Sequence, residues 1–252
     1  MTLVRLESQE GGVRLLTLAD PERRNALGAA MGAELIAACT AVRDDPEART
    51  LVVTGEGSAF CAGADLPALF GDADRPVTQT HALLQAYYRA FFAVLELPIP
   101  TVAAVNGPAV GAGLNLAMAC DVRIAGTDAA FGATFTRIGL HPGGGCTWFL
   151  VQALGASRAL RTLLLGETLD AQRAVAWGLA EGPEEDCVDA AVALAARFAR
   201  VDPQLARHVK RAVGIASETG DLSATLEYES WAQAASASSP QLKEWVARFA
   251  PE

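Results

Sequence analysis

Short runs of aliphatic and β-branched residues alternate with longer amphipathic stretches through the first half of the chain. The runs at 50–54, 101–105 and 122–125 have the length and composition of buried strands. Between them, apolar positions recur at helical spacing over 80–95 and from Gly111 onward. Because strands that alternate with helices pair in parallel, this pattern predicts an α/β core with functional sites at the carboxyl ends of its strands.

The two ends of the chain depart from this alternation. Runs at 3–6 and 13–18 predict an opening β-hairpin, and a helix is expected over 29–42. After residue 156 strand signals nearly vanish, and helical spacing covers 158–165, 170–177, 189–200, 203–216, 221–236 and 240–249. A helical tail this long must bury its apolar faces, so we expect a core over residues 1–195 and a helical region over 196–252.

Composition narrows the class of protein. With 252 residues, 51% of them hydrophobic, the chain can bury a large core. Its net charge of −9 argues against nucleic-acid and anionic-membrane partners. No stretch approaches the roughly 20 apolar residues of a membrane span, and no N-terminal signal is recognisable, so a cytoplasmic protein is expected. Five cysteines without paired or metal-ligand spacing predict reduced thiols and no metal site.

Two glycine-bearing turns, about fifty residues apart, are the most informative feature. One spans 59–66 and follows the strand-like run at 50–54, and the other spans 104–113 and follows the run at 101–105. Gly63 and Gly113 allow a close backbone approach, and the second turn opens a helix whose first N–H groups are unpaired. Turns at the ends of neighbouring strands can aim two N–H donors at one point, which is the arrangement that stabilises a negative oxygen on a carbonyl.

Both turns and their flanks resemble the crotonase (enoyl-CoA hydratase/isomerase) superfamily. The matching segments follow in family order at 21–27, 59–66, 111–121, 131–132, 139–145, 166–167 and 174–180. The resemblance implies a spiral of β-β-α units with C-terminal helices packed at a trimer interface, in a homotrimer or a dimer of trimers. It also implies a lyase or isomerase of fatty acid metabolism that acts on an acyl-CoA or enoyl-CoA thioester, so that coenzyme A belongs to the substrate and no separate cofactor is needed.

The same resemblance assigns residues to the site. The backbone N–H groups of Ala64 and Ala112 would bind the thioester oxygen, and Arg24 and Lys210 would lie near the coenzyme A phosphates. The complete set of expected substrate contacts is Arg24, Ala26, Ala62, Asp65, Leu66, Gly111, Phe135 and Lys210.

The acid/base carboxylates of the family are missing. Hydratases of the family use two glutamates, and their positions here hold Asn115 and Phe135. A third position, an aspartate in several isomerase branches, holds Gly143. Asn115 can still orient a water, whereas Phe135 can only shape the pocket. Losing a general acid or base removes about 10²–10⁴ in rate, so weak hydration is expected.

Three hypotheses about activity follow. In the first, His141 or an unrecognised base serves isomerisation, thioester or C–C hydrolysis, or another enolate reaction; His141 is the candidate because imidazole titrates near neutrality. In the second, the protein binds acyl-CoA with little catalytic power. In the third, it is a conventional hydratase that takes Asp72 or Asp74 from the polar 70–80 loop, which we expect to be mobile. His81 is a weaker candidate base, and Asp65 is the type of residue that caps backbone N–H groups.

Overall fold

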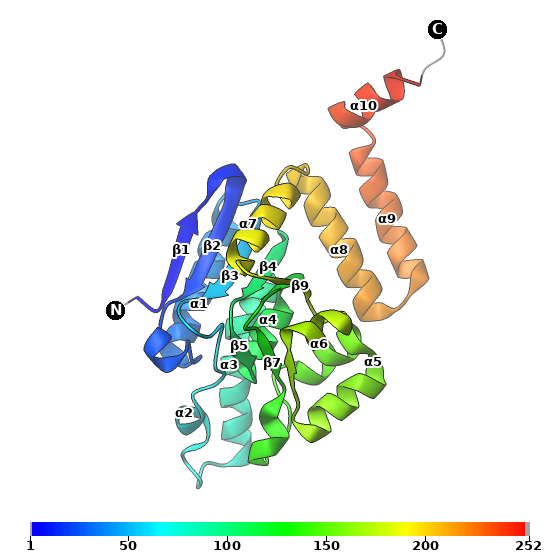
Figure 1. Cartoon of the computed structure of the whole chain (residues 1–252). Helices are drawn as coiled ribbons and strands as arrows, with labels where there is room; N and C mark the ends of the chain where they lie inside the picture. Colours follow the sequence, from blue (N-terminus) through cyan, green and yellow to red (C-terminus); the bar gives the residue numbers. More distant parts are fainter. Residues whose placement is uncertain (1, 250–252) are drawn as a thin grey trace. The chain divides into compact units, whose positions relative to one another are not determined.

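The structure is a computed structural model and describes residues 2–249 (Figure 1). The described chain divides into two compact units, which meet between Arg200 and Val201. The boundary expected after residue 195 would cut the helix α7 (Cys187–Phe198), so the structural division falls after that helix has ended.

The first unit is built on a six-stranded sheet. Its strands, in spatial order, are β1 (Val4–Ser8), β2 (Val13–Leu18), β3 (Thr50–Gly55), β4 (Thr101–Val105), β6 (Val122–Gly126) and β9 (Glu181–Glu184). β1 pairs antiparallel with β2 as a hairpin, and every other neighbouring pair is parallel. The predicted hairpin and parallel sheet are therefore confirmed, while β9 is a strand that the helical pattern did not reveal.

A second, three-stranded sheet lies in the same unit. It consists of β5 (Pro108–Val110), β7 (Ala130–Gly132) and β8 (Thr168–Asp170), with β5 parallel and β8 antiparallel to β7. Each strand has only three residues, which is too short for period-two alternation to be visible in the sequence. The expectation that strands end near residue 156 was therefore wrong for β8 and β9.

Helices cover both faces of the large sheet, which explains why its central strands are apolar throughout. On one face Val52 and Val102 pack against Ala191 of α7. On the other face Val53 and Ala103 belong to the main core, to which three helices contribute. These are α1 (Ala29–Asp44), α3 (Val77–Leu95) and α4 (Ala112–Ala119).

The remaining helices of the first unit connect these layers. They are η1 (Glu10–Gly12), η2 (Pro21–Arg23), α2 (Leu66–Phe70), η3 (Thr134–Ile138), α5 (Cys146–Leu165) and α6 (Ala171–Ala176). α5 begins twelve residues before the expected 158, and Gly155 interrupts it with left-handed backbone (φ 75°). The helical pattern was visible only after this glycine.

The second unit is helical, as predicted, and comprises α8 (Pro203–Thr219), α9 (Leu222–Ser236) and α10 (Pro240–Ala247). Asp202, Asp221 and Ser239 cap the helix N-termini through their side-chain oxygens. Large apolar side chains stay exposed within this unit, including Trp231 with 71% of its surface accessible. Among residues 2–249, no helix is both long and apolar enough to cross a membrane.

Candidate active site

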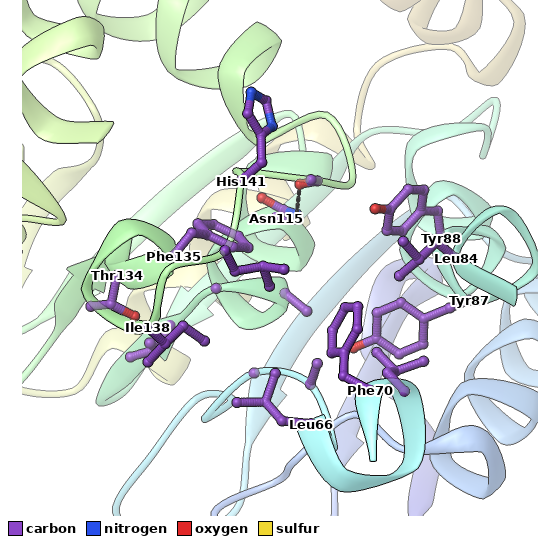
Figure 2. Close-up of a pocket in the computed structure, with 18 of the residues that line it drawn as sticks. Leu66, Phe70, Leu84, Tyr87, Tyr88, Asn115, Thr134, Phe135, Ile138 and His141 are labelled. Atoms are coloured by element: carbon purple, nitrogen blue, oxygen red, sulfur yellow. Dashed lines mark hydrogen bonds between the residues drawn. The ribbon is translucent and has the colours of Figure 1, made fainter. Parts of the chain in front are cut away.

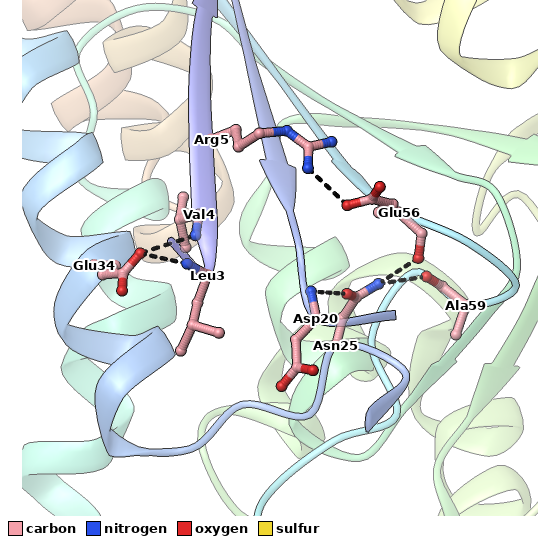
Figure 3. Close-up of polar contacts among 8 residues, drawn as sticks. All are labelled: Leu3, Val4, Arg5, Asp20, Asn25, Glu34, Glu56 and Ala59. Carbon is pink, nitrogen blue, oxygen red and sulfur yellow. Dashed lines mark hydrogen bonds and ion pairs between the residues drawn. The ribbon is translucent and has the colours of Figure 1, made fainter. Parts of the chain in front are cut away.

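A buried asparagine fixes the first turn to the loop that precedes α1. Asn25 is fully buried and donates from Nδ2 to the carbonyl oxygens of Glu56 (3.0 Å) and Ala59 (2.8 Å). Its Oδ1 accepts from the Asp20 N–H at 2.9 Å (Figure 3). Its backbone is left-handed (φ 57°), which asparagine tolerates better than most residues. The sequence interpretation gave Asn25 no role. Its position as a polar residue within the matched segment 21–27 could have indicated one.

The two glycine turns are joined backbone to backbone. Cys61 N–H donates to Pro108 O at 3.1 Å, and Val110 N–H donates to Cys61 O at 3.0 Å. Gly63 has a left-handed backbone (φ 106°), and a Cβ there would lie 2.6 Å from Val110 O. A Cβ on Gly113 would collide with the Cys61 backbone. Both glycines are therefore required by close approach, as their positions in the sequence predicted.

Each turn presents one unpaired N–H group. Leu27 N–H donates to Gly63 O (2.7 Å) and Asp65 N–H donates to Leu27 O (3.4 Å), which turns the intervening Ala64 N–H away from Leu27. Ala112 is the first residue of α4, where a helical N–H has no intrahelical acceptor. Within residues 2–249, neither N–H donates a hydrogen bond. Ala112 N lies 3.7 Å from the point that a Cβ on Gly63 would occupy, so the two turns meet.

These N–H groups border a cavity of about 140 Å³ (Figure 2). Its walls come from the first turn and α2, from α3, from the second turn and α4, and from the segment that runs from η3 to Gly143. The larger lining side chains are Leu66, Leu69, Phe70, Leu84, Tyr87, Tyr88, Phe91, Asn115, Phe135, Ile138, Leu140 and His141. In the described part of the chain no aspartate or glutamate lines this cavity, and no cluster of side chains suited to a metal ion is present.

The three vacant carboxylate positions lie together in the structure. Asn115 is 2% exposed, and its Nδ2 donates to Gly143 O at 2.9 Å. Its Oδ1 is buried without a partner among the described residues. Phe135 lines the cavity. A Cβ on Gly143 would lie 2.5 Å from the Tyr88 hydroxyl oxygen, so this hydroxyl occupies space that a side chain at 143 would need. Sequence reasoning missed Tyr88, because nothing in α3 marked which of its aromatic residues face the loop.

The side chains considered as bases are less well placed to reach a ligand in the cavity than the two N–H groups. His141 borders the cavity, but it is exposed, its Nδ1 is 2.7 Å from Pro142 O, and its ring points away from the cavity interior (Figure 2). Asp72 pairs with Arg75 (3.6 Å) and accepts from the Asp74 N–H (3.2 Å). Neither aspartate lines the cavity, and neither does the exposed His81.

Among the other expected contacts, Leu66, Ala62 and Gly111 line the cavity. Asp65 caps α2 by accepting from the Ala68 N–H (3.2 Å) and pairs with Arg23 at 2.8 Å. The Arg23 hydrogen bond is the main cause that lowers the pKa of the Asp65 carboxyl, and this keeps the cap ionised.

Three further expected contacts lie outside the cavity lining. The left-handed Arg24 accepts from the Ala62 N–H (2.9 Å) through its carbonyl oxygen, and Ala26 N–H donates to Arg23 O. Lys210 is half-buried on α8 of the second unit.

Cys61 is fully buried in the first turn, and burial raises the pKa of its thiol to about 11, which leaves it a poor nucleophile.

Comparison with known proteins identifies the family. Residues 8–251 match the family profile described as Enoyl-CoA hydratase/isomerase. The protein named Probable enoyl-CoA hydratase EchA14, of Mycobacterium tuberculosis H37Rv, is 50% identical over 191 residues, which cover 76% of this chain and 73% of that protein. The 1,2-epoxyphenylacetyl-CoA isomerase of Escherichia coli K12 is 35% identical over 247 residues, covering 97% and 94%. An enoyl-CoA hydratase structure from Bacillus anthracis has a TM-score of 0.89 at 30% identity, covering 98% of this chain and 95% of that chain.

The two-sheet α/β fold with C-terminal helices is therefore the crotonase fold, as the family resemblance of the sequence implied. The chain belongs to the enoyl-CoA hydratase/isomerase family of enzymes.

Proposed function

We propose that this protein binds an acyl-CoA thioester with its carbonyl oxygen between the N–H groups of Ala64 and Ala112, and stabilises the enolate formed from it. The observation that carries the proposal is the pair of unpaired N–H groups, held at one cavity by two turns that are bonded to each other. Donors fixed in this way stabilise charge as it develops on the oxygen without having to reorganise.

The reaction we propose is isomerisation or another enolate reaction, and not the addition of water. Water addition needs a group that activates water and a group that protonates Cα. Asn115 and Phe135 cannot exchange a proton at neutral pH, and the described cavity lining contains no carboxylate. Among the relatives, the Escherichia coli protein is named as an isomerase, so isomerisation occurs in a protein that is 35% identical to this chain.

The remaining hypotheses differ in which side chain, if any, transfers the proton. His141 as the base stays a prediction, and it requires the ring to rotate from its exposed position toward the cavity. The alternative, an acyl-CoA-binding protein with little catalytic power, is favoured by the absence of an inward-facing carboxylate or imidazole in the described lining. The third hypothesis requires Asp74 to enter the cavity, or Asp72 to leave its contacts with Arg75 and the Asp74 N–H and do so.

Two further proposals concern the rest of the ligand and the assembly. Arg24 and Lys210 would bind the coenzyme A phosphates, as the resemblance suggests. Because the net charge of the chain is −9, an anionic ligand needs local positive side chains of this kind. We also propose a homotrimer or a dimer of trimers, because apolar side chains such as Trp231 are exposed within the C-terminal unit.

A crystal structure of the complex with butyryl-CoA tests the central proposal. We expect the thioester oxygen near 2.9 Å from both nitrogens, since N–H···O bonds cluster about that distance. An isotope-edited infrared spectrum of the ¹³C-labelled carbonyl should shift to lower frequency on binding. A carbonyl oxygen beyond about 3.5 Å from both nitrogens, with no infrared shift, would contradict the proposal.

A further inference from the structure

One wall of the cavity consists of aromatic rings from α3. The ring centroids of Tyr87 and Phe91 are 6.2 Å apart, and those of Tyr88 and Phe91 are 5.8 Å apart, so the three rings form one contiguous cluster. Phe70 at the end of α2 and Phe135 from η3 contribute to the same cavity (Figure 2). Aromatic rings pack best against other rings in edge-to-face or offset arrangements.

The cavity size suits a single ring. Its volume of about 140 Å³ is close to the roughly 150 Å³ of an apolar cavity that binds benzene. A long flexible acyl chain would have to fold into this space and lose its rotational freedom, whereas a rigid ring would not.

Within this apolar wall, the Tyr87 hydroxyl is buried and has no partner among residues 2–249. Figure 2 shows the hydroxyl directed from α3 toward the interior of the cavity. Burial raises the pKa of Tyr87 well above its usual range, with smaller contributions from Cys61, Tyr88 and Asp65, so the hydroxyl remains a hydrogen-bond donor. A buried polar group without a partner is costly, and a bound molecule can supply the missing partner.

We propose that the acyl group of the substrate is an aromatic ring bearing an oxygen, and that the Tyr87 hydroxyl donates a hydrogen bond to this oxygen. This inference rests on the proposed function, since it places the ring in the cavity that the thioester would enter. The ring packs against Tyr87, Tyr88 and Phe91, and its oxygen distinguishes it from an unsubstituted ring. Tyr87 is thus a specificity-determining residue, and its role requires no proton transfer.

Calorimetric titration of the full chain with defined CoA thioesters tests this inference. The ligands are hexanoyl-CoA, phenylacetyl-CoA, the 2-, 3- and 4-hydroxyphenylacetyl-CoA isomers, and free coenzyme A. The proteins are the wild type, Tyr87→Phe, and the matched control Tyr228→Phe. The control removes a hydroxyl outside the cavity, where it lies 2.9 Å from His208 Nδ1.

We expect phenylacetyl-CoA to bind about 3–10-fold more tightly than hexanoyl-CoA, since one ring contact contributes a factor of that size. One hydroxylated isomer should bind a further about 3–10-fold more tightly, which corresponds to one neutral hydrogen bond. Tyr87→Phe should abolish only this second gain, while Tyr228→Phe should retain both gains.

The outcomes separate the inference from the proposed function. Equal or tighter binding of hexanoyl-CoA, or no gain from any hydroxylated isomer, overturns the aromatic specificity. An equal loss for every ligand in Tyr87→Phe, with its melting temperature lowered, assigns the hydroxyl a structural role and also overturns the inference. If no thioester binds more tightly than free coenzyme A, the proposed function itself fails.

Discussion

Replacing Ala112 by proline should remove one of the two N–H donors with little effect on the fold. Ala112 is the first residue of α4, where proline is favoured because the N–H has no intrahelical partner. The same N–H donates no hydrogen bond within the described chain, so its removal breaks no contact. The matched control is Ala29→Pro, which makes the same change at the exposed first residue of α1, also after a glycine.

The size of the expected effect follows from the role of the donor. Loss of one such donor costs about 10²–10³ in rate, or roughly 3–4 kcal/mol of transition-state stabilisation. Ground-state binding should weaken by at least about 3–10-fold, because a neutral hydrogen bond contributes about 0.5–1.5 kcal/mol and the proline Cδ takes the place of the N–H hydrogen beside the carbonyl oxygen. Solvent-deuterium exchange at Cα of phenylacetyl-CoA, followed by mass spectrometry, measures the first effect, and calorimetric titration with butyryl-CoA measures the second.

Exchange and affinity both within about twofold of the wild type in Ala112→Pro would refute the role of this N–H. If Ala29→Pro were equally impaired, the loss would come from proline at a helix start and not from the site. If wild-type protein exchanges no faster than buffer, the binding alternative gains support, and the affinity of Ala112→Pro then decides whether the donor contacts the thioester.

Three further predictions concern proton transfer and pH. Crotonyl-CoA hydration should fall far below the ~10 s⁻¹ typical of enzymes, and Asn115→Glu with Phe135→Glu should raise it if the pocket accommodates two buried carboxylates; a wild-type rate at the typical value would contradict this. If proton transfer occurs, His141→Ala should lower kcat by about 10²-fold with little change in affinity, and full activity would exclude His141. Burial raises the pKa of the Cys61 thiol from about 9 to about 11, so this thiol ionises at lower pH in the unfolded chain than in the folded protein. The stability that the thiol contributes below pH 9 is therefore lost between pH 9 and 11. Urea midpoints measured at pH 8 and 10, in the wild type and in Cys61→Ala, show whether the thiol is responsible.

The sequence was sufficient for features that depend on backbone pattern. Buried strands that alternate with helices predicted the parallel sheet, and glycines at strand ends predicted the close approach that Gly63 and Gly113 show. Three-residue strands such as β5 carry no periodicity, because their pairing depends on partners distant in the chain. Their positions could not be predicted from local composition.

Side-chain direction was also beyond the sequence. Counting residues placed His141 near the oxyanion turns, but a single-bond rotation decides whether its ring faces the cavity or solvent, and the structure has it facing solvent. The orientations of Tyr87 and Tyr88 likewise depend on how α3 is rotated against the loop at 139–145. The sequence identified which acid/base groups are missing, but it could not show which polar groups lie in their place.

The packing of the loop at Gly143 connects two of the positions at which the carboxylates of the family are missing. Asn115 donates to Gly143 O, and Gly143 lies beside the Tyr88 hydroxyl only because it has no side chain. A glutamate at 115 would replace that donor with oxygens facing a carbonyl oxygen, and burial would raise the pKa of the new carboxyl. An aspartate at 143 would require Tyr88 to move, because its Cβ would lie 2.5 Å from the hydroxyl. Positions 115 and 143 are therefore constrained by their neighbours, and the site as built is better suited to holding a thioester than to activating water.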